Sequence, residues 1–346
     1  MATIQERIQK IVLLCLSPLG DTIFATPAIR ALRESFPQAR IVVLASRIAA
    51  EVLKRNPFQL ELLAAGEKWD LVKILTAIRK EGFDIAVSLS QLGGFFTRFC
   101  AAPVWSDFTL VANEPYRSVV DLCHEVLKLI GINKPYRKTE FWLNPLDQRN
   151  VDLFLRGSDY DPEMPMVAVH AGGHYFVRKR WPIAKFIEAL GYLVDNGLQV
   201  ILVGGREDVE DSLMLRSEVP GIISAVGMLK LAETAALLSR CRLFIGNDSG
   251  PLHLAAALNT PTIGLFGPTN PQQFYPYRPI AHRHIYKNLS CSPCYRFGGG
   301  IWQYLPRCSK AYCMESISVA DLLTQVNQLL ASGKPRPDEV AYAERV

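Results

Sequence analysis

Asp21 is the first residue of the chain whose type and position could do chemistry. It lies in the segment Gly20-Asp21-Thr22, directly after an apolar run at residues 11–17. A carboxylate placed there could accept a proton from an attacking hydroxyl group. An aspartate at the start of a helix can equally cap backbone amides and complement the helix dipole. These residues alone leave both roles open.

A pair of glycines and a basic cluster follow a second apolar run, at residues 166–170. Gly172 and Gly173 would let a ligand approach the backbone closely, and Lys179 lies between two arginines just before a helical pattern. Together they suit a pyrophosphate bound by backbone amides and cationic side chains. A flexible turn with a solvated basic face is the alternative. Neither GxGxxG nor GxxxxGK[ST] occurs here, so ordinary dinucleotide or P-loop binding is not indicated.

Two further polar segments follow apolar runs in the second half of the chain. Glu207 could accept hydrogen bonds from a ribose or base, or it could simply lie in the first turn of the next helix. In the segment GNDSGPLH, a strand ends and a helix begins with Pro251 in its first turn, where the missing N–H costs nothing. The amides of Ser249 and Gly250 would then form an anion site at a positive helix end. His253 lies one turn further along this helix. It could be a structural residue, or it could lie beside the bound anion.

Four of the eight cysteines form two close pairs, a CxxC and a CxxxxC separated by 13 residues. These are Cys291, Cys294, Cys308 and Cys313. The pattern is typical of structural zinc sites, although the second pair is spaced more widely than usual. Iron is the second option, since it also accepts tetrahedral thiolate ligands. Such a metal would be structural, because sulfur fills all four positions. The alternative is reduced cysteines that pack a glycine-rich loop.

Short apolar runs alternate with helical patterns along most of the chain. This alternation predicts an α/β fold with parallel sheets covered by helices on both faces. The rhythm weakens at residues 143–165 and then restarts, so we expect two doubly wound, Rossmann-like domains facing a cleft. The expected domains are residues 1–155 and 156–330, followed by a polar tail at 331–346. The last helix, residues 316–330, could pack within the second domain or back on the first.

The composition is that of a globular protein. Hydrophobic residues make up 49% of the 346 residues and charged residues 21%, which argues against a disordered chain. The formal charge of +5 is too small and dispersed to indicate nucleic acid, but it suits an anionic ligand or membrane surface. No run approaches the roughly 18–20 apolar residues that span a bilayer, and residues 11–16 are too short for a signal-peptide core. We therefore expect a cytoplasmic location.

Taken in order, these segments resemble glycosyltransferase family 9, the ADP-heptose:lipopolysaccharide heptosyltransferases. The similar stretches are SPLGDTIFATPAIRALRESFPQARIVVLAS, KRWP and GNDSGPLHLAAALNTPTIGLFGPTNP. Residues 66–144 match less clearly and are expected to contribute to the acceptor side. The resemblance implies the GT-B fold and an inverting, metal-independent transfer. A sugar, expected to be heptose, would pass from a nucleoside-diphosphate sugar, expected to be ADP-heptose, to a hydroxyl of an acceptor such as lipopolysaccharide core.

The resemblance also implies roles for particular residues. Asp21 would be the catalytic base, Lys179 would contact the donor phosphate, and Glu207 would bind the nucleoside. The implied donor pocket comprises Gly172, Gly173, Lys179, Glu207, Asp248, Ser249, Gly250 and His253. A glycan or glycolipid acceptor would bind in the N-terminal domain, near Gly20 and Thr22.

The remaining expectations concern partners and alternatives. No cofactor is expected for catalysis and no nucleic acid as partner, whereas a lipid-linked acceptor suits peripheral contact with the cytoplasmic face of the inner membrane. One alternative is a GT-B-like sugar-nucleotide epimerase or hydrolase, in which Asp21 would activate water or shift a proton. The other is a non-catalytic subunit that binds sugar nucleotides.

Overall fold

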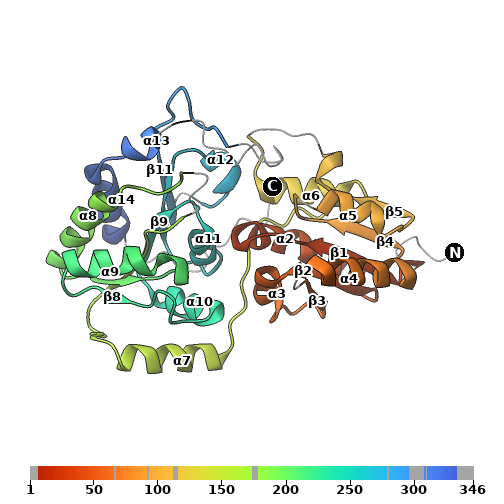
Figure 1. Ribbon diagram of the computed structural model, residues 1–346, viewed down its shortest axis with the longest axis horizontal. Coiled ribbons are helices and arrows are strands. Elements are labelled where there is room, and N and C mark those ends of the chain that lie inside the picture. The colour runs from red at the N-terminus through yellow and green to blue at the C-terminus, as the bar shows by residue number, and fades with distance from the viewer. Residues whose placement is uncertain are drawn as a thin grey trace. The chain divides into compact units, whose positions relative to one another are not determined.

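The chain forms two compact units, each built around its own parallel sheet. The computed structural model describes residues 7–65, 68–91, 93–111, 116–173, 178–278, 280–295, 308 and 310–332 (Figure 1). The first unit ends at Trp142 and the second begins at Leu143. The α/β class with two doubly wound sheets, predicted from the alternation of apolar runs and helical patterns, is confirmed.

The first sheet has the strand order β3-β2-β1-β4-β5, and all its pairings are parallel. The order changes direction between β1 and β4, which defines the point where ligands bind in such sheets. The strands are β1 (Lys10–Cys15), β2 (Arg40–Ser46), β3 (Glu61–Ala65), β4 (Ile85–Ser88) and β5 (Val104–Ser106). The α-helices are α2 (Leu19–Ser35), α3 (Arg47–Leu53), α4 (Lys68–Glu81), α5 (Gly93–Phe99) and α6 (Val119–Lys128).

The second sheet has the order β11-β10-β9-β6-β7-β8, again entirely parallel, with its change of direction between β6 and β9. The strands are β6 (Met166–His170), β7 (Gln199–Leu202), β8 (Ile223–Ser224), β9 (Leu243–Asn247), β10 (Thr262–Phe266) and β11 (His282–Tyr286). The α-helices are α7 (Pro145–Arg156), α8 (Ile183–Asp195), α9 (Val209–Glu218), α10 (Leu231–Arg240), α11 (Gly250–Ala257), α12 (Pro271–Phe274), α13 (Tyr312–Glu315) and α14 (Val319–Ala331).

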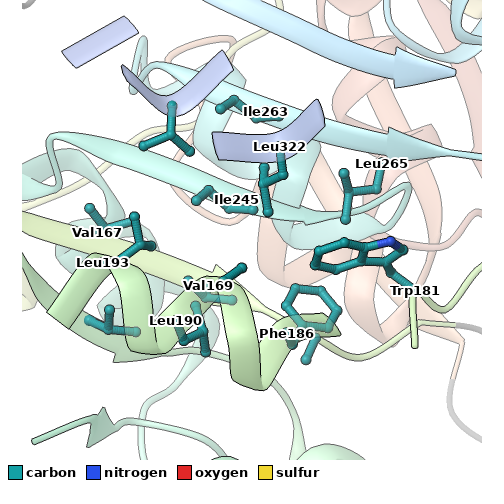
Figure 2. Packing of buried hydrophobic residues seen from close by; sticks show 14 of the residues in the cluster. Val167, Val169, Trp181, Phe186, Leu190, Leu193, Ile245, Ile263, Leu265 and Leu322 are labelled. Atoms are coloured by element: carbon teal, nitrogen blue, oxygen red, sulfur yellow. The ribbon is translucent and has the colours of Figure 1, made fainter. Parts of the chain in front are cut away.

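Side chains alternate between the two faces of the second sheet, and one face packs against α8 and α14. Val167 and Val169 of β6 lie beside Leu193 and Leu190 of α8 (Figure 2). Trp181 packs edge-to-face on Phe186, with ring centroids 4.9 Å apart, and both side chains are buried in this core. The KRWP motif is therefore anchored by its tryptophan, which fixes the position of the two basic residues before it.

Helix α7 lies in the second unit. It begins with a capping box at Asn144, and Asn150 donates a hydrogen bond to Glu233 of α10 at 2.8 Å. The contacts thus divide the chain between residues 142 and 143, earlier than the 155/156 boundary expected from the sequence. Because α7 pairs with α10, it belongs with the sheet that follows it.

Helix α14 also packs within the second unit. Its apolar residues join the core under α8, and the helix lies against β10 and β11. The sequence had left open a return of this helix to the first domain, whereas Val319–Ala331 makes its contacts with the second sheet. Among the described helices, none has both the length and the apolar character needed to cross a membrane.

Candidate active site

The polar residues of the second unit gather beyond the carboxyl ends of β6, β7 and β9. β6 and β9 are neighbours, and the direction of strand order changes between them. In open parallel sheets this edge is where ligands bind, because the chain leaves adjacent strands toward opposite faces.

The loop after β9 leads directly into the N-terminus of α11. Ser249 is the N-cap residue and Gly250 the first helical residue, so their amides stand at the positive end of the helix. The Ser249 side chain makes no capping hydrogen bond, although serine usually supplies one at this position. The structure thus confirms the helix start that was predicted here, whereas the anion site at this helix end stays a prediction.

Lys179 and His253 both contact the carboxylate of Asp248. Lys179 Nζ lies 2.7 Å from Oδ2, and His253 Nε2 lies 3.2 Å from Oδ1. The side chain of Asp248 is 3% exposed and that of Lys179 is 15% exposed. Burial by itself would raise the pKa of Asp248, but the charge of Lys179 and the hydrogen bond of His253 outweigh it. The pKa is held below the ordinary value of an aspartate, so this carboxylate is ionised.

Two aromatic rings surround the ammonium group of Lys179. Its Nζ is 5.1 Å from the ring centroid of Tyr295 and 5.7 Å from that of Phe274. Such cation–π contacts favour the charged amine when it is partly desolvated. Lys179 is therefore a cation held in place from two sides, with limited access to water.

Asn247 joins the loop after β6 to the KRWP motif, a role that the sequence analysis missed. Its Nδ2 donates to the carbonyls of Ala171 and Gly172 at 2.9 and 2.8 Å, and its Oδ1 accepts from the amide of Trp181 at 3.0 Å. All three of these hydrogen bonds join the buried side chain to the backbone of two loops. Its position at the end of a predicted strand was the available signal.

Gly172 lies against a side chain of the protein itself. A Cβ atom at Gly172 would stand 2.0 Å from Asp208 Oδ1, and one at Gly204 would stand 2.6 Å from Asp208 Oδ2. Asp208 was not predicted as a site residue, yet its carboxylate fills the space that these two glycines leave. Glu207, the preceding residue, is exposed, and its carboxylate lies over Gly205.

Asp21 lies in the first unit, in the first turn of α2, and is half-buried. This is the position at which a carboxylate is favoured in its ionised form by the helix dipole. Two buried thiols lie near it. Burial raises the pKa of Cys15 to about 12, and the negative charge of Asp21 adds to this rise. The same two causes raise the pKa of Cys123.

The four clustered cysteines differ in exposure. Cys291 is exposed, Cys294 and Cys308 are intermediate, and Cys313 is buried. Burial raises the pKa of Cys313 to about 11, with smaller contributions from Cys294 and Cys308, so these three thiols lie within electrostatic reach of one another. Within the described residues, no three His, Cys, Asp or Glu side chains are grouped as metal ligands. Residues 296–307, between the two pairs, and residue 309, inside the second pair, lie outside the described part.

Two doubly wound parallel sheets, one in each unit, are the architecture of the GT-B fold. The sequence model of glycosyltransferase family 9 (heptosyltransferase) matches residues 72–298. The chain belongs to this family and is a glycosyltransferase, which confirms the resemblance found in the sequence.

Individual relatives agree with this assignment. The chain is 26% identical over 354 residues to lipopolysaccharide heptosyltransferase 3 of Escherichia coli, covering 90% of this chain and 97% of that protein. Its fold is similar to that of E. coli ADP-heptose lps heptosyltransferase II, with a TM-score of 0.74, 21% identity, and coverage of 94% and 99%. It is also similar to TibC, an iron-containing dodecameric glycosyltransferase of enterotoxigenic E. coli, with a TM-score of 0.62, 15% identity, and coverage of 94% and 77%.

Proposed function

We propose that this glycosyltransferase moves a heptose from ADP-heptose to a hydroxyl group of a lipopolysaccharide core acceptor, with inversion at the anomeric carbon. The observation that carries the proposal is the placement of Lys179, a cation held beside the N-terminus of α11 at the ligand-binding edge of the second sheet. The names of the similar proteins, which specify ADP-heptose and lipopolysaccharide, support this choice of donor and acceptor.

The second unit would bind the donor. The diphosphate would lie between Lys179 and the amides of Ser249 and Gly250, since charge-assisted hydrogen bonds and a helix N-terminus both favour phosphate oxygens. Glu207, exposed in the segment that follows β7, would accept hydrogen bonds from the nucleoside. Gly173, Asp248 and His253 would complete the pocket, with Asp248 holding Lys179 in place before the donor arrives.

The first unit would bind the acceptor and supply the base. Asp21 would take the proton of the acceptor hydroxyl as its oxygen attacks the anomeric carbon. The bond from that carbon to the diphosphate oxygen breaks, and ADP leaves with the electron pair. Lys179 and the N-terminal end of α11 would stabilise the charge that develops on the leaving phosphate. One general base is enough for this displacement, without the carboxylate pair that glycosidases use.

The proposed partners follow from the acceptor. A lipopolysaccharide core intermediate would be bound near Gly20 and Thr22, in the cytoplasm, with peripheral contact between the protein and the inner membrane. Nucleic acid is not among the proposed partners.

A structural metal on the four cysteines is a separate proposal. Four thiolates are a donor set that suits zinc or iron, and the similar TibC is iron-containing. The described cysteines do not form a ready ligand group by themselves, so the ligands would have to come together on metal binding. The metal would stabilise the segment around α13 and would take no part in the transfer.

The function is tested by incubating the protein with ADP-heptose and a truncated core acceptor, and following ADP release and acceptor mass together. We expect ADP release that depends on the acceptor, with the acceptor gaining one heptose. Free heptose or an epimerised donor would indicate a hydrolase or epimerase instead, and binding without turnover a non-catalytic subunit. UDP-N-acetylglucosamine serves as the mismatched donor and should release no nucleotide.

A further inference from the structure

A buried polar network centred on His170 in the second unit has no role in the proposed mechanism. His170 is the last residue of β6 and is 5% exposed. Its Nδ1 lies 2.9 Å from Ser249 Oγ, and its Nε2 lies 3.2 Å from Asp208 Oδ2. The histidine thus joins a carboxylate after β7 to the N-cap residue of α11. Because a carboxylate only accepts hydrogen bonds, the Nε2 atom carries the proton of that contact.

Asp208 is itself fixed by several groups besides His170. Its Oδ2 accepts a hydrogen bond from the amide of Gly205 at 3.0 Å, and Arg180 approaches its Oδ1 to 3.5 Å. The contact with His170 and these neighbours keep the pKa of Asp208 below its ordinary value, although burial alone would raise it. An ionised carboxylate with a fixed position that accepts a hydrogen bond from Nε2 sets the orientation of the imidazole ring. Carboxylates that accept a hydrogen bond from metal-binding histidines orient those rings in the same way.

The consequence of this orientation is seen at Ser249. With the proton of the imidazole on Nε2, the Ser249 hydroxyl donates its one hydrogen to His170 Nδ1. Its oxygen also lies 3.1 Å from the carbonyl oxygen of Asn247, and it makes no capping bond to the helix. An N-cap serine that is not held in this way accepts a hydrogen bond from the first-turn amides of its own helix. His170 therefore keeps the serine oxygen away from the amides of α11, which leaves this helix end open toward an anion.

We infer that His170 is a positioning residue for the donor diphosphate, oriented by Asp208 and acting through Ser249. This inference rests on the proposed function, because it takes the diphosphate of the sugar nucleotide as the anion at α11. His170 touches neither the donor nor the acceptor. It sets the direction of the Ser249 hydroxyl, so its loss weakens binding of the diphosphate and leaves binding of the nucleoside unchanged.

Two substitutions separate the two contacts of the imidazole. The amide of an asparagine reaches the position of Nδ1, so His170→Asn keeps the contact with Ser249. The amide of a glutamine reaches the position of Nε2, so His170→Gln keeps the contact with Asp208. The probes are ADP and adenosine, measured by calorimetry on the full chain. We expect His170→Gln to weaken ADP binding about tenfold, the size of one net hydrogen bond, with adenosine affinity unchanged. His170→Asn should bind ADP within about threefold of the wild type.

A double-mutant cycle tests whether His170 acts through Ser249. Ser249→Ala should bind ADP within about threefold of the wild type by itself, because no side-chain oxygen is left that could cover the amides of α11. Combined with His170→Gln it should restore most of the lost affinity, because the serine oxygen that is no longer held by His170 has been removed. The control is Thr260→Val, which removes a buried hydrogen bond from Thr260 to the carbonyl of Leu238. Thr260 lies just before β10, at the amino ends of the strands and therefore away from the proposed donor site. It should lower the melting temperature and leave ADP affinity unchanged.

Three results would overturn the inference. These are wild-type ADP affinity in His170→Gln, a double variant that binds ADP no better than His170→Gln alone, and equal weakening of ADP and adenosine. In each of these cases the wild type still binds ADP, so the proposed function stands. If the wild type itself binds neither ADP nor ADP-heptose, the proposed function fails and the inference fails with it.

Discussion

Lys179 and Asp248 form an ion pair at 2.7 Å between the KRWP motif and the loop after β9, and the carboxylate is almost fully buried. Both residues were expected to line the donor pocket, but their contact with each other was not expected. The lysine that is proposed to bind the diphosphate already has an anionic partner. A buried pair of this kind adds little net stability, while the removal of one partner leaves an uncompensated charge.

Replacing Lys179 should therefore have two effects that can be separated. Lys179→Met should weaken ADP binding about 10- to 150-fold, since a charged hydrogen bond is worth about 1.5–3 kcal/mol. It should also lower stability, because Asp248 loses its cation. In the double variant Lys179→Met/Asp248→Asn, most of the lost stability should return, because no unpaired charge remains. The ADP affinity should stay low, because the lysine–phosphate contact is still missing. Calorimetry and urea unfolding measure the two quantities, with Lys287→Ala, which removes the surface pair with Asp321, as the control. Unchanged ADP affinity in Lys179→Met would move the phosphate site elsewhere.

The depressed pKa of Asp248 predicts how stability depends on pH. The folded-state pKa lies below the unfolded value of about 3.9, so the contribution of this group is fully present well above that value and is lost as the pH falls through and below it. Asp248→Asn should be less stable than the wild type at neutral pH, and the difference should persist on acidification until the pH falls below about 3.9, where it should shrink. Urea unfolding at several pH values checks this. Asp152→Asn, which removes a half-exposed partner of Arg240, should cost at most about 1 kcal/mol. A pH-independent difference between wild type and Asp248→Asn would contradict the prediction.

Gly172 should tolerate no side chain, because Asp208 occupies the space in front of it. Gly172→Ala is expected to cost about 1–3 kcal/mol, as overpacking usually does. Gly191→Ala is a matched control inside α8, where a Cβ would meet nothing within 4 Å, and it should stabilise by about 0.5–1 kcal/mol. In an Asp208→Ala background the cost of Gly172→Ala should fall. If it does not, the carboxylate is not what excludes the side chain.

Much of the fold could be predicted from the sequence, because buried parallel strands are short apolar runs and helices follow them with a different period. Met166–His170 has the bounds that the apolar run at residues 166–170 predicts. The elements between residues 93 and 128 were not predicted. Strand β5 has only three residues, and its first is exposed, so it carries almost no periodic signal.

The candidate site could be predicted only in part, for a different physical reason. Motifs located Lys179, Asp248 and Ser249, since loops after parallel strands converge at one edge of the sheet. His170 and Asp208 were missed because their importance lies in contacts 79 and 38 residues away along the chain. No local pattern encodes such pairs. For the same reason Gly172 was interpreted as room for a ligand, although its neighbour is a carboxylate of the protein.

Asp21→Asn should abolish transfer while ADP affinity stays unchanged. The variant keeps a polar group that can complement the helix start and loses the proton acceptor, so kcat should fall by about 10²–10⁴-fold. Asp121→Asn is the matched control, because Asp121 occupies the same kind of first-turn position in α6 of the same unit and serves Ser118 there. It should lower stability slightly and leave kcat unchanged. Near-wild-type turnover in Asp21→Asn would reduce Asp21 to a helix-capping residue.

The cysteine pairs should hold one metal ion if the proposed structural site exists. Elemental analysis of the purified protein should then find about one zinc or iron per chain, bound by thiolate ligands. The segment between the pairs is rich in glycine and has few periodic apolar residues, so metal binding would supply the free energy that orders it. Chelation or Cys294→Ser should remove the metal and lower the melting temperature.

The effect on transfer separates a structural metal from a catalytic one. In Cys294→Ser, kcat per folded molecule should stay close to that of the wild type, because Asp21 and Lys179 lie outside the metal ligands. Cys241→Ser is the control, since Cys241 is buried at the end of α10 and donates to the carbonyl of Leu237. It should keep the metal. A metal-free preparation with the same melting temperature and full activity would show that the four cysteines pack as reduced thiols instead.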